Sequence, residues 1–300
     1  MTETIGFIGL GAMGKPMASN LAKKGFALVV YDTDAAPVKA ISALGARAVG
    51  SVAEVARAAD IVFTMLPNSP DVEAVVLGAG GIAAAARKDT LVVDMSTIDP
   101  IVTDKLAARL REAGLGFVDA PVGRTVTQAI TGESLFMVGA SDNDFGRVKP
   151  ALGGMGTTII HCGPAGAGIR MKLVNNFLAV ASCQLTAEAL ALAQKFGLDI
   201  KTTLEVCTGT TATNGHLTRM WPIKVLSGDT APGFRIELAH KDMSLVVDAA
   251  GKFGVPVPMG AAAREALSVA KGTDDYAMRD FSALLDLVCQ QSRVNPPRMK

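Results

Sequence analysis

Short apolar runs alternate with alanine-rich, helix-forming stretches through the first half of the chain. The runs are rich in β-branched and aromatic residues, which is typical of strands. Strands separated by helices are joined by crossover connections, so the sheet they form is mainly parallel. Runs that are apolar at successive positions are expected where helices cover both faces of the sheet. The predicted strands lie in "TIGFIGL", "ALVVYDT", "DIVFTML", "TLVVDMS", "GFVDAP" and "SLFMVGA".

The pattern changes after "TTIIHCGPAGAG". From Ile169 to about Lys195 no proline or glycine interrupts an apolar-rich stretch, which predicts one long helix. Beyond it, glycines and prolines separate further stretches of helical composition, and alternation with period two is scarce. We therefore predict a doubly wound α/β domain over residues 1–165 and an all-helical domain over residues 166–300, joined through the long helix.

Composition narrows the class of protein. The chain has 300 residues and is 49% hydrophobic, which is enough for a substantial core. Its 29 lysines and arginines nearly cancel its 28 aspartates and glutamates, so bulk charge gives no argument for binding nucleic acid or a membrane surface. No apolar run approaches the roughly 18 residues that span a bilayer. The four cysteines are far apart and no secretory leader is evident, which favours a cytoplasmic protein.

A glycine pattern follows the first predicted strand. Gly9, Gly11 and Gly14 form GxGxxG directly after "IGFI" and directly before the helix-like "KPMASNLAKKG". In this context the turn, which also contains Ala12 and Met13, brings backbone N–H groups and a helix N-terminus onto a pyrophosphate. The alternative is a tight turn without a ligand. We predict a Rossmann dinucleotide site.

The second predicted strand ends in Asp32. At that position a carboxylate can hydrogen-bond the ribose hydroxyls of the adenosine and repels a 2′-phosphate, which favours NAD (NADH) over NADP. The nearest following basic residue, Lys39, is too far along the next helix to reverse this preference. Alternatively, Asp32 is a surface turn or cap residue.

Two further loops follow predicted strands, at the edge where doubly wound sheets bind ligands. The first, "MLPNSP", brings Met65, Leu66 and Pro67 to this edge, and the second, "MSTIDP", brings Ser96 and Thr97. We predict that both loops contact the cofactor. For Ser96 and Thr97, capping of the next helix is an equally good interpretation.

Lys172, Asn175 and Asn176 share one face of the long predicted helix. The helix is otherwise strongly apolar there, so a polar cluster on it indicates a buried cleft. Because desolvation lowers the pKa of a buried lysine, such a lysine can hold or release a proton near neutral pH, as a general acid or base must. The three histidines stand singly without metal-ligand spacing, so no metal site is predicted.

Taken in order, "FIGLGAMGKPMASNL", "DMST", "DAPVGRT…AITG", "GIRMKLVNN" and "HKD" resemble the β-hydroxyacid dehydrogenase (3-hydroxyisobutyrate dehydrogenase) family over nearly the whole chain. The resemblance implies a Rossmann domain and an all-α domain that drives dimer or tetramer assembly. It also implies that Lys172 is the catalytic acid/base and that Asn176 holds substrate. Ser96 and the loop 121–125 would line the site, and Lys241 would approach the cofactor.

The loop departs from most relatives, which have Gly-Gly or Ser-Gly where this chain has Gly123, Arg124 and Thr125. This form resembles most the branch of the family that reduces 3-sulfolactaldehyde. A sulfonate offers three acceptor oxygens, which the guanidinium, the Thr125 hydroxyl and the amide of Asn175 would satisfy. A carboxylate suits the same donors, so a semialdehyde reductase remains the alternative, and a non-catalytic nucleotide-binding module is a third. A loop arginine that pairs with an aspartate or caps a helix is the structural alternative for Arg124.

Overall fold

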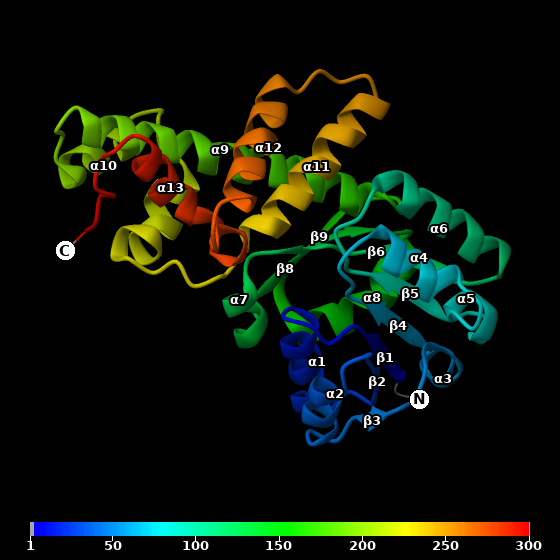
Figure 1. The fold of residues 1–300 in the computed structure, drawn as a ribbon. Helices are drawn as coiled ribbons and strands as arrows, with labels where there is room; N and C mark the ends of the chain where they lie inside the picture. The colour runs from blue at the N-terminus through cyan, green and yellow to red at the C-terminus, as the bar shows by residue number, and fades with distance from the viewer. Residues whose placement is uncertain (1–2, 300) are drawn as a thin grey trace. The chain divides into compact units, whose positions relative to one another are not determined.

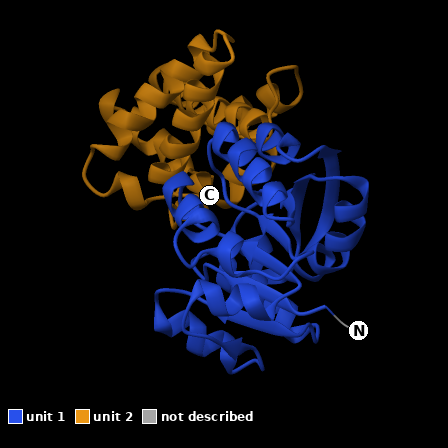
Figure 2. Ribbon diagram, turned by 90° about the vertical axis from the view of Figure 1, so that its right-hand side faces the viewer, with its two compact units in different colours: residues 1–172 blue, residues 173–300 orange. Residues whose placement is uncertain are grey.

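The computed structural model describes residues 3–299, which divide into two compact units. The first unit contains residues 1–172 and the second contains residues 173–300 (Figure 2). Each unit has its own hydrophobic core.

The first unit is built on one sheet of nine strands, in the order β3-β2-β1-β4-β5-β6-β8-β7, with β9 paired to β8 (Figure 1). The sheet is parallel except where β8 runs antiparallel to β6 and β7. All six predicted strands and the mainly parallel sheet are confirmed, whereas β3, β7 and β9 were not predicted. The strands are β1 (Ile5–Ile8), β2 (Leu28–Tyr31), β3 (Arg47–Ala48), β4 (Ile61–Thr64), β5 (Leu91–Asp94), β6 (Gly116–Asp119), β7 (Val122–Gly123), β8 (Ser134–Gly139) and β9 (Gly156–Gly163).

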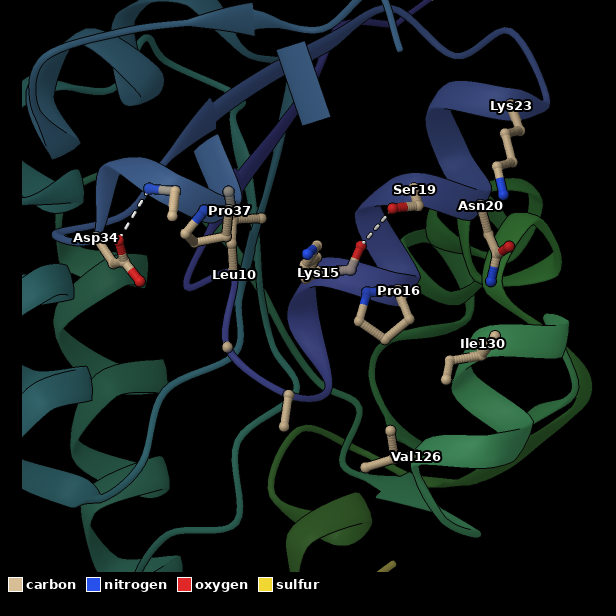
Figure 3. A pocket seen from close by; sticks show the side chains of 13 residues that line it. Leu10, Lys15, Pro16, Ser19, Asn20, Lys23, Asp34, Pro37, Val126 and Ile130 are labelled. Carbon is tan, nitrogen blue, oxygen red and sulfur yellow. Dashed lines mark hydrogen bonds between the residues drawn. The ribbon is translucent and has the colours of Figure 1, made fainter. Parts of the chain in front are cut away.

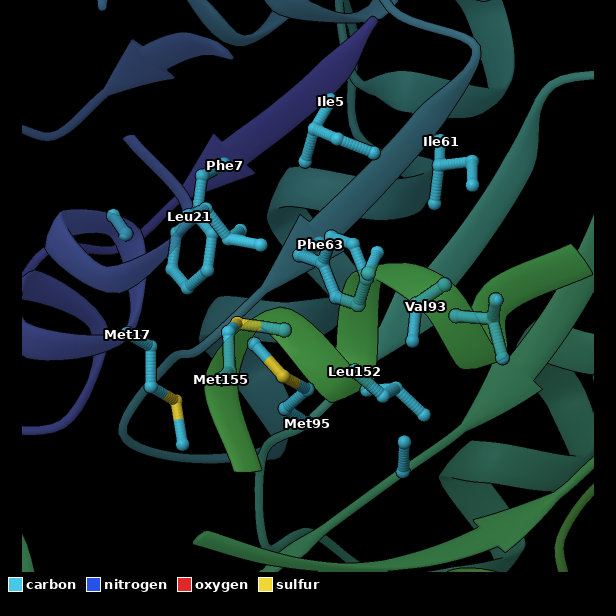
Figure 4. Close-up of a cluster of buried hydrophobic side chains, with 14 of the residues drawn as sticks. Ile5, Phe7, Met17, Leu21, Ile61, Phe63, Val93, Met95, Leu152 and Met155 are labelled. Atoms are coloured by element: carbon cyan, nitrogen blue, oxygen red, sulfur yellow. The ribbon is translucent and has the colours of Figure 1, made fainter. Parts of the chain in front are cut away.

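Helices cover both faces of the sheet, as the continuous apolar strands require. On one face α1 (Gly14–Lys23), α2 (Ala35–Ser42) and α8 (Asp142–Met155) bury a cluster that includes Phe7 and Phe63 (Figure 4). On the other face α3 (Val52–Ala58), α4 (Ser69–Leu77) and α6 (Pro100–Glu112) bury a second cluster. The unit also contains α5 (Ile82–Ala85) and α7 (Val126–Thr131). The doubly wound Rossmann-like architecture is thus confirmed.

The second unit is helical in the residues that the structure describes, as predicted. Its core surrounds the fully buried Trp221. The long helix α9 (Ala167–Lys195) begins in the first unit and continues into the second. The others are α10 (Ile200–Thr208), α11 (Ile236–Lys252), α12 (Pro258–Lys271) and α13 (Leu284–Gln291), with short helical turns between α10 and α11 and between α12 and α13.

By length and composition α9 is apolar enough to cross a membrane, so the prediction that no stretch approaches such a span is corrected. Half of its most apolar window is buried inside the structure. Val180, Cys183 and Ala187 of this helix belong to the core of the second unit. The core helices of soluble proteins meet the same criteria, and the burial of α9 matches that role.

Candidate active site

The glycine loop between β1 and α1 combines two tight positions with one open position. A side chain at Gly9 would overlap the carbonyl of Met65, and one at Gly14 would overlap the carbonyl of Gly9. Gly9 also has a φ of +93°, which L-residues rarely adopt. A Cβ at Gly11, in contrast, would meet no atom within 4 Å. The loop therefore leaves space beside Gly11 where a phosphate can approach the backbone, which fits the predicted dinucleotide.

The carboxylate of Asp32 lies between this loop and the turn that follows β2. Its Oδ2 accepts a hydrogen bond from the Leu10 amide at 2.5 Å, and its Oδ1 accepts one from the Asp34 amide at 2.8 Å. Asp34 in turn caps α2 by accepting a hydrogen bond from Ala36 N at 2.9 Å. Asp32 thus has the turn role that was the alternative for it, and it also lies beside the glycine loop.

A cavity of about 620 Å³ begins at Gly11 and Ala12 of the glycine loop (Figure 3). It extends along α1 and is flanked by the start of α2 and by α7. A cavity of this size is typical of small-molecule sites. Its other lining residues are Leu10, Lys15, Pro16, Ser19, Asn20, Lys23, Asp34, Ala36, Pro37, Val126 and Ile130.

The ends of β4 and β5 are joined by a buried polar cluster. One Asp94 oxygen accepts hydrogen bonds from the hydroxyls of Thr64, at 2.8 Å, and Ser96, at 2.6 Å. The Ser96 hydroxyl also accepts a hydrogen bond from Leu66 N at 2.9 Å, so Ser96 fixes both loops to each other. Asp99 caps α6, so the alternative that Ser96 or Thr97 caps that helix is wrong. Other predicted cofactor residues in this unit are Met13, which precedes α1, Met65 and Pro67 in the loop after β4, and Thr97 in the loop after β5.

Arg124 follows β7 in the left-handed conformation, with a φ of +72°. Its guanidinium donates hydrogen bonds to the carbonyl of Glu133 and to the hydroxyls of Thr157, at 3.2 Å, and Thr158, at 3.0 Å. The exposed side chain is thus held to the segments around β8 and β9, through a carbonyl and two hydroxyls. It has a structural role, but not the aspartate pairing or helix capping of the structural alternative.

Thr125 is the N-cap residue of α7, and Gly123 before Arg124 is buried in β7. The backbone N–H of Thr125 donates to the side-chain oxygen of Gln128 at 3.2 Å, and its hydroxyl donates to the same oxygen at 2.7 Å. The hydroxyl must change partner if it is to donate to an anion.

Lys172 lies on α9 at the end of the first unit and is only 9% exposed. Its Nζ donates a hydrogen bond to the carbonyl of Val122 at 2.7 Å. The ammonium group is therefore fixed to the segment that carries Gly123 and Arg124.

In the second unit the predicted residues gather around a buried carboxylate, Asp242. Asn176 is buried, and its Nδ2 donates to Asp242 Oδ2 at 2.6 Å. Lys241 forms an ion pair with Asp242 Oδ1 at 3.1 Å. Asn175 is exposed, contrary to the expectation of a buried cluster, and it donates to Asn176 Oδ1 at 3.0 Å.

Sequence reasoning did not single out Asp242, although it stands in "HKD" beside Lys241. Its 3% exposure and its contact with a residue 66 positions earlier mark it as the organiser of this group. Among residues 3–299, no group of three or more His, Cys, Asp or Glu side chains has an arrangement that suits a metal ion.

Comparison with known protein families matches both parts of the chain. Residues 4–163 match the model described as the NAD binding domain of 6-phosphogluconate dehydrogenase. Residues 166–288 match the model described as NAD-binding of NADP-dependent 3-hydroxyisobutyrate dehydrogenase.

Individual proteins match over nearly the full length. The chain is 43% identical to the 3-sulfolactaldehyde reductase of Escherichia coli K12 over 284 residues, which are 95% of both proteins. It is 39% identical to the 2-(hydroxymethyl)glutarate dehydrogenase of Eubacterium barkeri over 291 residues, covering 97% of this chain and 96% of that protein. The solved structure of Mycobacterium tuberculosis 3-hydroxyisobutyrate dehydrogenase with L-serine aligns with a TM-score of 0.88, at 32% identity, covering 96% of this chain and 99% of that one.

Proposed function

The chain belongs to the 3-hydroxyisobutyrate dehydrogenase family of NAD(P)-dependent β-hydroxyacid dehydrogenases, and from this premise we propose that it is an NADH-dependent reductase of a short anionic hydroxyaldehyde. The preferred substrate is 3-sulfolactaldehyde, reduced to 2,3-dihydroxypropane-1-sulfonate in sulfoquinovose breakdown. The observation that carries this choice is the Gly123-Arg124-Thr125 segment at the end of β7, supported by 43% identity to a 3-sulfolactaldehyde reductase.

Lys172 is the proposed acid. The bound nicotinamide supplies hydride to the carbonyl carbon. Lys172, held by Val122 O, protonates the oxygen that becomes the alcohol. The amide of Asn176, one turn further along α9, orients that oxygen while Asp242 fixes the amide. Lys241, paired with the same carboxylate, is proposed to contact the cofactor.

Arg124 is the proposed anion-binding residue. Of the five N–H groups of a guanidinium, three donate to Glu133, Thr157 and Thr158 within the described residues, which leaves two for an anion. Two parallel N–H groups match two oxygens of a sulfonate or carboxylate. We assign Gly123, Thr125, Ser96 and the exposed amide of Asn175 to the same substrate site.

The substrate assignment is tested by comparing kcat/KM at fixed NADH for 3-sulfolactaldehyde and for succinic, methylmalonic and tartronic semialdehydes. We expect 3-sulfolactaldehyde to be favoured by at least about tenfold, the discrimination typical of one well-matched charged contact. A semialdehyde preference would replace the sulfonate assignment with a carboxylate one. Nucleotide binding without turnover of any of the four would support the non-catalytic module.

NAD is the proposed cofactor because two carboxylates, Asp32 and Asp34, lie at the turn after β2. We expect kcat/KM for NADH to exceed that for NADPH by about 100-fold, since a 2′-phosphate meets both charges. Asp34→Ser keeps a residue that can cap α2 but removes one negative charge. It should therefore lower the ratio of kcat/KM for NADH to that for NADPH severalfold. A wild-type preference for NADPH in a side-by-side titration would overturn the proposal.

We also propose a cytoplasmic homodimer or homotetramer. An apolar stripe on α9 supports self-association, because its members recur at helical spacing and all are more than half exposed. The stripe consists of Val174, Leu178, Leu185 and Leu192 on α9 and of Phe196, the residue that directly follows the helix. The four cysteines are free thiols, in keeping with a reducing compartment.

Leu185→Glu should shift the protein toward monomer in sedimentation velocity, because a charge would be buried against the partner's apolar surface. Ile101→Glu, an exposed apolar position on α6, is the matched control. A monomeric wild type at micromolar concentration would contradict the stripe's proposed role.

A further inference from the structure

The carboxylate of Asp119, at the end of β6, is buried against the first turn of α9. One oxygen accepts a hydrogen bond from Gly166 N and the other accepts one from Ile169 N, both at 2.6 Å. The first N–H groups of a helix have no partner within the helix, and a negative charge there interacts favourably with the helix dipole. Asp119, at 2% exposure, therefore holds the start of α9 through both of its oxygens.

The backbone of α9 also touches the strand ends directly. A Cβ at Gly168 would overlap the Met137 carbonyl and would lie 2.7 Å from the Asp119 carbonyl. A Cβ at Gly139 would overlap the Asp119 carboxylate and would lie 2.8 Å from the backbone nitrogen of Gly168. Contacts this close leave the first turn of α9 little freedom to shift while Asp119 keeps its hydrogen bonds.

Lys172 lies three residues after Ile169 on the same helix. Its Nζ reaches Val122 O, three residues after Asp119 in the chain. Because the helix is rigid between Ile169 and Lys172, the position of its first turn determines where the Lys172 ammonium lies relative to the loop 121–125.

We propose that Asp119 is a positioning residue for Lys172, and that uptake of a proton by its carboxyl loosens the first turn of α9 and displaces the Lys172 ammonium. The proposal rests on the catalytic role proposed for Lys172. A protonated carboxyl has one oxygen committed as a hydroxyl, so it accepts the two N–H groups less well than a carboxylate does.

The environment of Asp119 brings the protonation of its carboxylate into an experimentally accessible pH range. Burial raises the pKa of Asp119 to about 6, against the opposing effect of its hydrogen bonds to Gly166 and Ile169, and the nearby Asp94 on β5 raises it further. Burial and, to a smaller extent, Asp119 in turn raise the pKa of Cys162 on β9. The pKa of Arg170 on α9 is raised by its pairing with Asp104 of α6 and, to a smaller extent, by Asp119.

The sign of the stability change follows from the raised pKa. The folded state holds the proton more tightly than the unfolded chain, so this contribution to stability is complete below pH 3.8 and is lost as the pH rises through about 6. Between these values the unfolding equilibrium constant should increase by about 100-fold through Asp119 alone. The anchoring of α9 has the opposite pH dependence: under the proposal it is best above pH 6, where the carboxylate accepts both hydrogen bonds, although the buried charge lowers the overall stability of the fold.

The test compares Asp119→Asn with Asp104→Asn, which removes the exposed carboxylate that pairs with Arg170 on the same helix. Three readouts are measured between pH 5 and pH 8. They are the amide shifts of Gly166 and Ile169 by NMR, the acylation rate of Lys172 by mass spectrometry, and the kcat and KM of the enzyme. The first two need neither substrate nor cofactor, so they remain informative if the proposed reaction is wrong.

We expect both amides to titrate near pH 6 in the wild type and in Asp104→Asn, but not in Asp119→Asn. Lys172 should be acylated severalfold faster in Asp119→Asn, and kcat should fall about tenfold with KM changed less than about twofold. In the wild type kcat should fall as the pH drops through about 6, and this fall should be absent in Asp119→Asn.

A folded Asp119→Asn protein with wild-type Lys172 acylation and an unchanged pH profile would refute the proposal. If Asp119→Asn does not fold, the pH dependence of Lys172 acylation in the wild type tests the proposal by itself. In it, Lys172 acylation corrected for intrinsic amine reactivity must rise as the pH falls through 6, and a flat profile would refute the coupling.

Discussion

Lys172→Ala should lower kcat by about 100- to 10,000-fold, the contribution typical of a positioned general acid. We expect this fall in kcat because the Lys172 ammonium is buried, is held by the Val122 carbonyl and lies one helical turn before Asn176. The affinity for NADH should change little, because the proposed cofactor contacts lie on the glycine loop, in the loops after β2, β4 and β5, and on α11. Rapid-mixing kinetics and a fluorescence titration of NADH separate the two quantities.

Two controls test whether the loss of kcat is specific to the Lys172 amine. Lys195→Ala removes a lysine from the last turn of the same helix and should leave kcat unchanged. Added methylamine should restore part of the activity of Lys172→Ala, because a small amine can occupy the vacated space and donate the proton. Unchanged turnover in Lys172→Ala would end the assignment of this residue as the acid.

The strands that sequence analysis identified are those whose apolar runs are buried on both faces. β1, β4 and β5 are buried at every position, so their sequences carry the signal without help from distant residues. Most of α9 is identifiable from sequence as well, because no glycine or proline interrupts its apolar-rich pattern from Ile169 to Lys195.

The missed strands lack that signal. β3 and β7 have two residues each, too few to show a period. Within residues 3–299, β9 pairs only with β8, and it is mostly exposed or half-buried, so "TTIIHCG" does not resemble a core strand. Such strands depend on their neighbours in the sheet more than on their own sequence.

The candidate site likewise has features that local sequence patterns predict and features that depend on contacts between distant residues. Glycine spacing and the lysine-bearing helix are local patterns, and they predicted the loop at Gly9 and the position of Lys172. The buried carboxylates Asp119 and Asp242 act on residues 47 to 66 positions away, and no spacing in the sequence reveals such pairs. The contacts of Arg124 with Thr157 and Thr158 are likewise visible only in the folded chain.

Arg124→Gly is the clearest test of anion recognition. Glycine accepts the φ of +72° at this position without strain, so the variant removes the guanidinium while preserving the turn. We expect KM for 3-sulfolactaldehyde to rise by about 10- to 100-fold, which corresponds to the loss of charged hydrogen bonds. kcat should fall far less, because Lys172 keeps its partner.

The structural role of Arg124 has to be separated from this effect, because its guanidinium also holds Glu133, Thr157 and Thr158. Thr157→Val with Thr158→Val removes the two hydroxyl contacts but keeps the guanidinium, and a melting curve measures what they contribute to stability. Arg124→Lys keeps the charge but not the planar fork, so its KM should lie between those of wild type and Arg124→Gly. A neutral aldehyde such as glyceraldehyde should show nearly the same KM in all these variants. If its KM rises as much as that of the sulfonate, Arg124 supports the fold of the loop and does not recognise the anion.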